Sequence, residues 1–261
     1  MSHLSPLGIG LLFLSAVGAG VMNAMAGGGT LLTFPSLLAA GVSPVMANAT
    51  NAVALVPGSL TSGWTYRDEL GTHGRRLIVY LVASSVLGGF VGATLVAVAG
   101  DALFRRLVPW LIIGATVLFV LQEPLRRWRE RRSVSGEGRP ALGEGSLWEL
   151  AAAHFVVSVY GGFFGAGMGI LMLAELGFVG LTNIHQMNGL KNYGAAFINL
   201  TAAVTFIAGG HVEWGLAGLM AVGAIIGGWA GASLAVRIGQ AAVRWSVVAI
   251  GVVSGLFTLF V

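Results

Sequence analysis

The only lysine of the chain, Lys191, lies within an apolar stretch rather than at an obvious end of one. A charged side chain inside a hydrophobic span is costly and usually marks a functional site. The alternatives are a side chain that reaches from near an interface to water, or a structural pair with a carboxylate. An ammonium group supplies three donors and a point charge, which suits a tetrahedral or pyramidal oxyanion. We therefore predict that Lys191 binds an anion.

Polar side chains accompany the lysine and recur earlier in the chain. Asn188 and Asn192 are four residues apart, and Asn48 and Asn51 are three apart, so each pair shares a helix face. Amides within a bilayer need partners and therefore face protein or a cavity. They either hold helices together or bind substrate, and we include all four, with Thr50, in the predicted site.

Two glycine-rich runs precede these polar clusters, at residues 27–30 and 161–169. Consecutive glycines interrupt a helix, and the start of the next helix attracts anions through free N–H groups and its dipole. Close packing of small residues between helices is the alternative. We favour a broken-helix site for both runs, in which the anion binds at Gly28, Gly29, Thr30, Gly167 and Gly169.

Three titratable residues stand out near these clusters. Glu175 lies in an apolar segment, where it either takes up a proton coupled to transport or pairs with Lys191. His185, six residues before Lys191, is a candidate for the entrance and for proton coupling. His154, within a long span, is expected to be a satisfied packing histidine.

The composition requires that lipid cover most of these elements. Of the 261 residues, 56% are hydrophobic and only 9% are charged, against about 25% charged in a soluble domain. The absence of cysteine excludes disulfides and thiolate metal sites. We expect a multi-pass protein of the cell membrane, inner in bacteria.

Apolar stretches of about 20 residues, the length that spans a bilayer, occur in two groups. Residues 1–122 contain four, at 7–26, 44–64, 77–99 and 103–122, and residues 147–261 contain four more, at 147–166, 187–208, 214–236 and 241–261. Each half also has one short piece, at 30–40 and 170–181. The linker between the halves, residues 123–146, carries six arginines and is predicted to be cytoplasmic.

The two halves are copies of one repeat. Residues 88–95 read Gly-Gly-Phe-Val-Gly-Ala-Thr-Leu, and residues 227–234 read Gly-Gly-Trp-Ala-Gly-Ala-Ser-Leu. For these two glycine pairs we favour close helix packing. The loop arginines favour inverted halves of five crossings each, with the short pieces crossing; if those pieces are re-entrant, the halves are parallel, four plus four. The fold class is thus all-α.

Catalytic patterns are missing from the sequence. It holds no metal-ligand spacing, no nucleotide-type phosphate loop, no cofactor motif and no Ser-His-Asp set that can be placed together. We expect no enzymatic activity, no cofactor or metal, and no nucleic-acid partner.

Residues 18–51 contain Gly-Ala-Gly, then Asn-Ala-Met-Ala-Gly-Gly-Gly-Thr-Leu-Leu-Thr-Phe-Pro and Ala-Asn-Ala-Thr-Asn. This segment, with its second copy at 161–192, resembles the sulfite exporter TauE/SafE family, and the resemblance covers nearly the whole chain. It implies a small inner-membrane permease for sulfur-containing anions, since family members are associated with sulfite, sulfoacetate and other sulfonates. Half two departs from half one where Glu175 replaces Pro35 and Lys191 replaces Thr50, which leaves the anion open.

These observations predict a secondary transporter that works by alternating access, with a small anion and the lipid bilayer as its partners and a homodimer as a candidate assembly. Export could run on the membrane potential alone, whereas import would need a coupled cation, with Glu175 as the proton carrier. The alternatives are a passive anion channel and a non-transporting membrane sensor subunit.

Overall fold

The computed structural model describes residues 5–25, 27–65, 75–134, 144–178, 181, 183–238, 245, 248–249 and 251–256. Much of the loop 66–76, the middle of the linker and most of the stretch 241–261 therefore fall outside the described residues, as does the side chain of His185. Within the described part the chain is helical and contains no strand.

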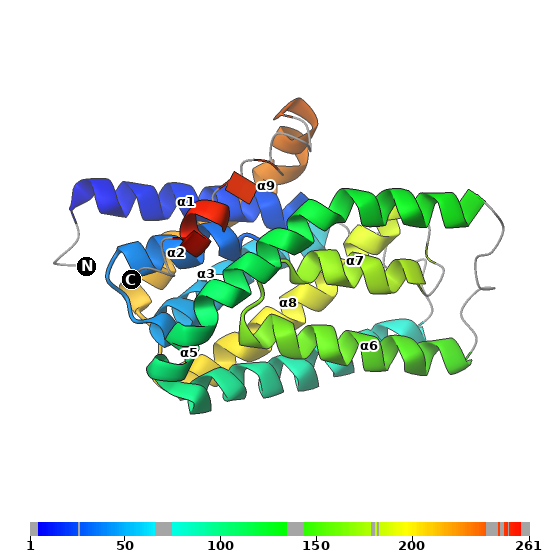
Figure 1. The fold of residues 1–261 in the computed structure, drawn as a ribbon, viewed down its shortest axis with the longest axis horizontal. Coiled ribbons are helices and arrows are strands. Elements are labelled where there is room, and N and C mark those ends of the chain that lie inside the picture. The colour runs from blue at the N-terminus through cyan, green and yellow to red at the C-terminus, as the bar shows by residue number, and fades with distance from the viewer. Residues whose placement is uncertain are drawn as a thin grey trace.

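The helices follow the apolar stretches of the sequence. They are α1 (Pro6–Met25), α2 (Thr30–Ala39), α3 (Pro44–Thr65), α5 (Arg75–Val134), α6 (Glu144–Phe163), α7 (Met168–Phe178), α8 (Ile184–Ala208) and α9 (Trp214–Ile238) (Figure 1). The short helices α2 and α7 occupy the two short apolar pieces. Helix α5 joins two predicted spans and is interrupted between them at Gly100. Gly100 has φ 68° and ψ 171°, a conformation that glycine adopts readily. Helix α5 also extends to Val134, into the first part of the predicted linker.

Three described helical segments are long and apolar enough to cross a membrane: Pro6–Ala24, Arg75–Leu118 and Trp214–Gly231. Many side chains on the outside are apolar, including Val98, which is 80% exposed, and Trp229, which is 76% exposed. Such a surface suits lipid rather than water. The prediction of an all-helical membrane protein is confirmed at this level.

Glycines bring the long helices into close contact. Helix α1 packs against α9, and α5 packs against α6. A Cβ added to Gly227 of α9 would lie 2.0 Å from the carbonyl oxygen of Val17 in α1. A Cβ on Gly88 of α5 would lie 2.5 Å from the Cβ of Ser158 in α6. Because only glycine fits at such crossings, the predicted packing role is confirmed for Gly88 and Gly227.

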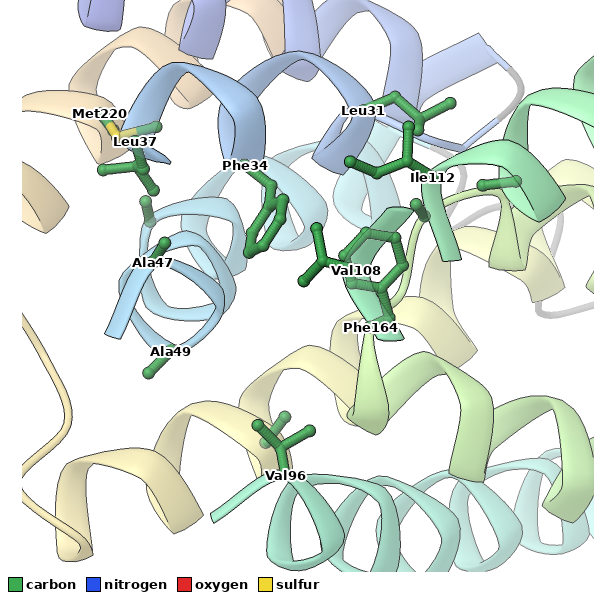
Figure 2. Packing of buried hydrophobic residues seen from close by; sticks show 14 of the residues in the cluster. Leu31, Phe34, Leu37, Ala47, Ala49, Val96, Val108, Ile112, Phe164 and Met220 are labelled. Carbon is green, nitrogen blue, oxygen red and sulfur yellow. The ribbon is translucent and has the colours of Figure 1, made fainter. Parts of the chain in front are cut away.

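An aromatic contact joins the two short-helix regions in the core. Phe34 of α2 and Phe164, which follows α6, are both buried, and their rings meet edge to face with centroids 5.2 Å apart. Figure 2 shows Phe34 pointing from α2 toward Val108 of α5, with Phe164 beside them. Edge-to-face pairs add to the stabilisation that burial provides. The contact holds α2 in place against the segment that leads into α7.

Candidate functional site

The breaks after α1 and after α6 meet inside the protein. Gly27 and Gly28 have positive φ values of 74° and 137°, and Gly165 and Gly167 have φ of 77° and 75°. A Cβ added to Gly27 would lie 2.8 Å from the Cα of Gly169. Both predicted helix breaks therefore exist, and their backbones touch.

A pocket lies at this contact. It has an empty volume of about 320 Å³ counted out to its mouth, and α1, α3, α7, α8 and the first break contribute to its wall. The residues that line it are Asn23, Gly27, Ser59, Met168, Gly169, Lys191, Asn192, Ala195 and Asn199. Among the predicted binding residues, the pocket brings together Gly169, Lys191 and Asn192.

Lys191 reaches into this pocket from α8. Its side chain is only 1% exposed, and its Nζ lies 3.4 Å from the backbone oxygen of Asn23 in α1. The side chain is therefore not at a lipid or water surface, which removes the explanation that it reaches from near an interface to water. A buried ammonium is costly unless an anion or several acceptors compensate its charge.

Two further donors point to the same ligand. Asn192 is 3% exposed, and within the described part of the chain its Nδ2 has no hydrogen-bond partner. Gly169 is the second residue of α7, where its N–H group has no acceptor within its own helix, while the N–H groups of Met168 and Ile170 donate to the backbone oxygens of Gly165 and Gly167. With Lys191, these groups give the pocket a positive charge, an amide donor and a helix N-terminus. That set is suited to an oxyanion.

Asn23 caps the N-terminus of α2. Its Oδ1 accepts hydrogen bonds from the N–H groups of Gly28, at 3.0 Å, and Gly29, at 2.9 Å. A side-chain oxygen in this position satisfies donors that the start of α2 would otherwise leave unpaired. The prediction that these two N–H groups are open to an anion is therefore wrong for this conformation. Asn23 itself was not among the predicted site residues.

Asn51 lies away from the pocket and has a structural role. Its Nδ2 donates to Thr30 Oγ1 at 3.1 Å, and its Oδ1 accepts a hydrogen bond from Thr33 Oγ1. All three side chains are buried, and they tie α3 to α2. In this structure Asn51 and Thr30 contact each other rather than the pocket.

The remaining polar residues of half one also bond to protein. The Nδ2 of Asn48 donates to the backbone oxygen of Phe163 at 3.1 Å, and Thr50 Oγ1 accepts from the N–H of Glu213 at 3.0 Å. Neither lines the pocket. In half two, Asn188 and Gly167 also lie outside the lining, although the Oδ1 of Asn188 is buried without a partner within the described part.

Sequence reasoning missed one polar pair that lines the pocket. The Nδ2 of Asn199 donates to Ser59 Oγ at 3.2 Å, which joins α8 to α3. A signal was available, because Asn199 lies seven residues after Asn192 and therefore on the same face of α8. The two partners are 140 residues apart, close to the offset between the repeats.

A second polar cluster is buried between α5, α6 and α7. His154 Nδ1 contacts Glu175 Oε1, and His154 Nε2 lies 2.9 Å from Ser85 Oγ. Glu175 thus has His154 as its partner, and His154 is more than a packing residue. No Ser-His-Asp set was expected from the sequence; the structure instead brings a serine and a histidine together with a glutamate that follows the histidine by 21 residues. Ser85 is fully buried and does not line the pocket.

An all-helical chain with an apolar exterior and a donor-lined internal pocket at two helix breaks has the architecture of a membrane transporter. The chain belongs to the sulfite exporter TauE/SafE family, whose sequence pattern matches residues 12–258.

Similar proteins carry the same kind of description. The chain is 31% identical over 260 residues to the probable membrane transporter protein YfcA of Escherichia coli K12. The aligned residues make up 98% of this chain and 91% of that protein. It is 28% identical over 244 residues to a probable membrane transporter protein of Haemophilus influenzae, with 92% and 90% covered. It is 25% identical over 241 residues to the probable membrane transporter protein ORF9 of a Sinorhizobium species, with 90% and 86% covered. No solved structure matches the chain.

Proposed function

We propose that this protein is a secondary transporter that carries a sulfur-containing anion, such as sulfite or a small organosulfonate, across the inner membrane. The observation that carries the proposal is the buried Lys191 beside Asn192, whose Nδ2 has no partner within the described residues, in a pocket at the meeting point of two broken helices. Membership of the TauE/SafE family supports a sulfur oxyanion as the substrate. The relatives are named as probable membrane transporters, which supports transport rather than catalysis.

The donor set favours a compact group with several oxygens. Lys191 supplies a positive charge, and Asn192 and the N-terminus of α7 add donors from other directions. A sulfite or sulfonate group presents three oxygens around one sulfur, so it can accept from all three sources at once. A carboxylate can accept as many hydrogen bonds, but its two oxygens lie in one plane and cannot face donors in three directions at once.

The arrangement of the helices supports alternating access. Helix α1 packs on α9, and α6 packs on α5; α3 also contacts α9, and α8 also contacts α5. Exchanging the two halves maps each of these contacts onto another. In Figure 1, α1 runs away from the N label, whereas α6 enters from the opposite side and runs the other way. These relations support inverted repeats that rock around the pocket, as in other transporters with central sites.

The test is sulfite flux in proteoliposomes, with Lys191→Met as the diagnostic variant. Methionine keeps much of the length and packing of lysine but removes the charge and the donors. The matched control is Arg105→Met, which removes one positive charge from an exposed position on α5. We expect saturable flux in the wild type and in R105M, and at least roughly a tenfold loss in K191M, as expected when a hydrogen bond to a charged group is lost.

Normal flux in K191M would overturn the proposed site. Wild-type flux that rises with concentration and does not saturate would contradict a carrier and point to a channel. Saturable binding of sulfite without flux would instead support a sensor.

A further inference from the structure

We propose that Ser85, His154 and Glu175 form a proton-binding site, separate from the anion pocket, whose proton load is coupled to anion binding through α7. The inference rests on the proposed function, because it assigns the proton site of the same transport cycle. The sequence suggested Glu175 as a proton carrier. The structure adds the histidine that shares its proton, the serine behind that histidine, and the helix that connects them to the pocket.

The three side chains form one continuous hydrogen-bonded chain across three helices. Ser85 belongs to α5, His154 to α6 and Glu175 to α7. Their exposed fractions are 0%, 1% and 6%, so the chain is enclosed by protein. Both ring nitrogens of His154 are engaged, Nε2 with Ser85 and Nδ1 with Glu175. A proton taken up by these three side chains therefore lies between His154 and either Ser85 or Glu175.

Two protonation states fit this geometry with the same heavy-atom contacts. In the loaded state one proton lies between His154 Nδ1 and Glu175 Oε1, a second proton on Nε2 points to Ser85 Oγ, and the cluster has no net charge. In the unloaded state the Nε2 proton has left, Nδ1–H donates to the carboxylate, and the Ser85 hydroxyl turns to donate to Nε2. A serine hydroxyl can both donate and accept, so it serves either state. The unloaded cluster carries one negative charge.

Stabilisation of the fold is a poor explanation for the cluster. The second carboxylate oxygen, Glu175 Oε2, is buried and has no hydrogen-bond partner within the described part of the chain. Buried ionic groups with unsatisfied atoms contribute little stability compared with apolar side chains of the same size. The unloaded state, with an unsatisfied carboxylate inside the bilayer, is the costlier one. Release of the proton therefore favours a conformation in which α7 moves and water reaches Glu175.

Four other titratable groups on the helices around α7 have contacts elsewhere. On α8, the Nζ of Lys191 lies 3.4 Å from the Asn23 oxygen, and Tyr193 stacks against Phe197. On α6, the Tyr160 hydroxyl donates to the backbone oxygen of Ala166. On α5, Tyr80 stacks edge to face on Trp148. Lys191 is the group among these whose charge bears on both sites, because it lines the pocket.

Helix α7 carries a part of each site. Met168 and Gly169, at its start, line the anion pocket, and Glu175 follows Gly169 by six residues, or about 9 Å of helix. At that distance in a protein interior, the negative charge of the unloaded cluster repels a bound anion. Loading the proton removes this repulsion, so proton and anion bind together. The geometry therefore predicts symport, with one proton taken up per anion.

The test uses the full chain in lipid nanodiscs and methanesulfonate as the probe, because this anion keeps its charge over roughly pH 5.5 to 8.5. Two quantities are measured: the dissociation constant as a function of pH, and the protons taken up per bound anion, followed with a pH indicator. In the wild type we expect the dissociation constant to rise with pH, by up to about tenfold per pH unit where the cluster unloads. Uptake should approach one proton per anion.

Glu175→Gln is the decisive variant, because glutamine mimics the loaded carboxyl and cannot release a proton. E175Q should bind methanesulfonate as tightly at high pH as the wild type does at low pH, and should take up less than half as many protons. His154→Gln is the second variant and should also weaken the pH dependence; it serves alone if E175Q does not fold. Any pH dependence that arises from Lys191 persists in both variants and is thereby separated.

The outcomes distinguish the two proposals. Binding that requires Lys191 but has the same pH dependence and proton uptake in wild type, E175Q and H154Q would overturn the proton site and leave the transporter intact. Absence of any Lys191-dependent binding or flux of sulfite and methanesulfonate would overturn both.

Discussion

Gly27 and Gly169, which belong to different halves of the chain, are so close that a Cβ on Gly27 would lie 2.8 Å from the Cα of Gly169. This backbone contact lies at the pocket and brings the start of α7 next to the break after α1. It is a contact between main chains, so it cannot be relieved by a change of rotamer. The two helix breaks must therefore move together or separate altogether.

We expect Gly27→Ala to disrupt both the fold and transport. Gly27 has a φ of 74°, which costs alanine about 1–2 kcal/mol, and the added methyl would overlap the Gly169 backbone, at a further cost of about 1–3 kcal/mol. Gly41→Ala is the control, because its φ of 82° imposes the same backbone cost while nothing lies within 4 Å of the added Cβ. Thermal unfolding in detergent and sulfite flux measure the two effects. Equal behaviour of the two variants would show that the contact does not matter.

Asn51 and Asn192 occupy nearly matching positions in the two halves but should respond oppositely to alanine. Asn51→Ala removes the partner of the buried Thr30 hydroxyl and leaves the Thr33 hydroxyl with the Gly29 oxygen alone, and we expect a loss of about 1–3 kcal/mol of unfolding free energy. Asn192→Ala removes a donor that has no protein partner in the described part, so stability should change by less than about 0.5 kcal/mol. Flux should instead fall at least about tenfold. Each variant is the control for the other, and a stability loss in N192A without a flux defect would contradict the assignment.

Gly227→Ala should weaken the contact between α1 and α9. Its Cβ would lie 2.0 Å from the Val17 carbonyl oxygen, so the helices must separate, and we expect a loss of about 1–3 kcal/mol. Gly218→Ala, on the same helix, meets nothing within 4 Å and should be neutral or stabilising by up to about 1 kcal/mol. Chemical or thermal unfolding of both variants in one detergent gives the comparison. A G227A protein as stable as G218A would refute a packing role for this glycine.

Much of the fold was predictable because apolar length and glycine pattern act locally. The short helices α2 and α7, the breaks before them and the glycine crossings at Gly88 and Gly227 were all expected from the sequence. The extension of α5 to Val134 was not expected, because a run of arginines indicates exposure to water without revealing whether the segment is helical. Charge reports exposure, whereas helix formation depends on backbone propensity and neighbours.

The site was predictable only in part, since hydrogen-bond partners are chosen by tertiary packing. Lys191 and Asn192 stood out because charge and amides are costly among apolar residues, and both line the pocket. The sequence did not reveal that Asn51 bonds to Thr30, or that His154 meets Glu175, because these contacts join different helices. The repeat itself misled, since it suggested that equivalent residues in the two halves have equivalent roles.

The hydrogen bonds that Asn23 accepts from Gly28 and Gly29 have a consequence for the stoichiometry of transport. A duplicated scaffold starts with two helix N-termini that face one another, and therefore with two places for an anion. In this structure the side-chain oxygen of Asn23 occupies the first place, while the corresponding position before α7 holds a phenylalanine, Phe163. We therefore expect each transport cycle to carry a single anion. The duplication provides the two halves that move, and the loss of symmetry between them limits the number of anions to one.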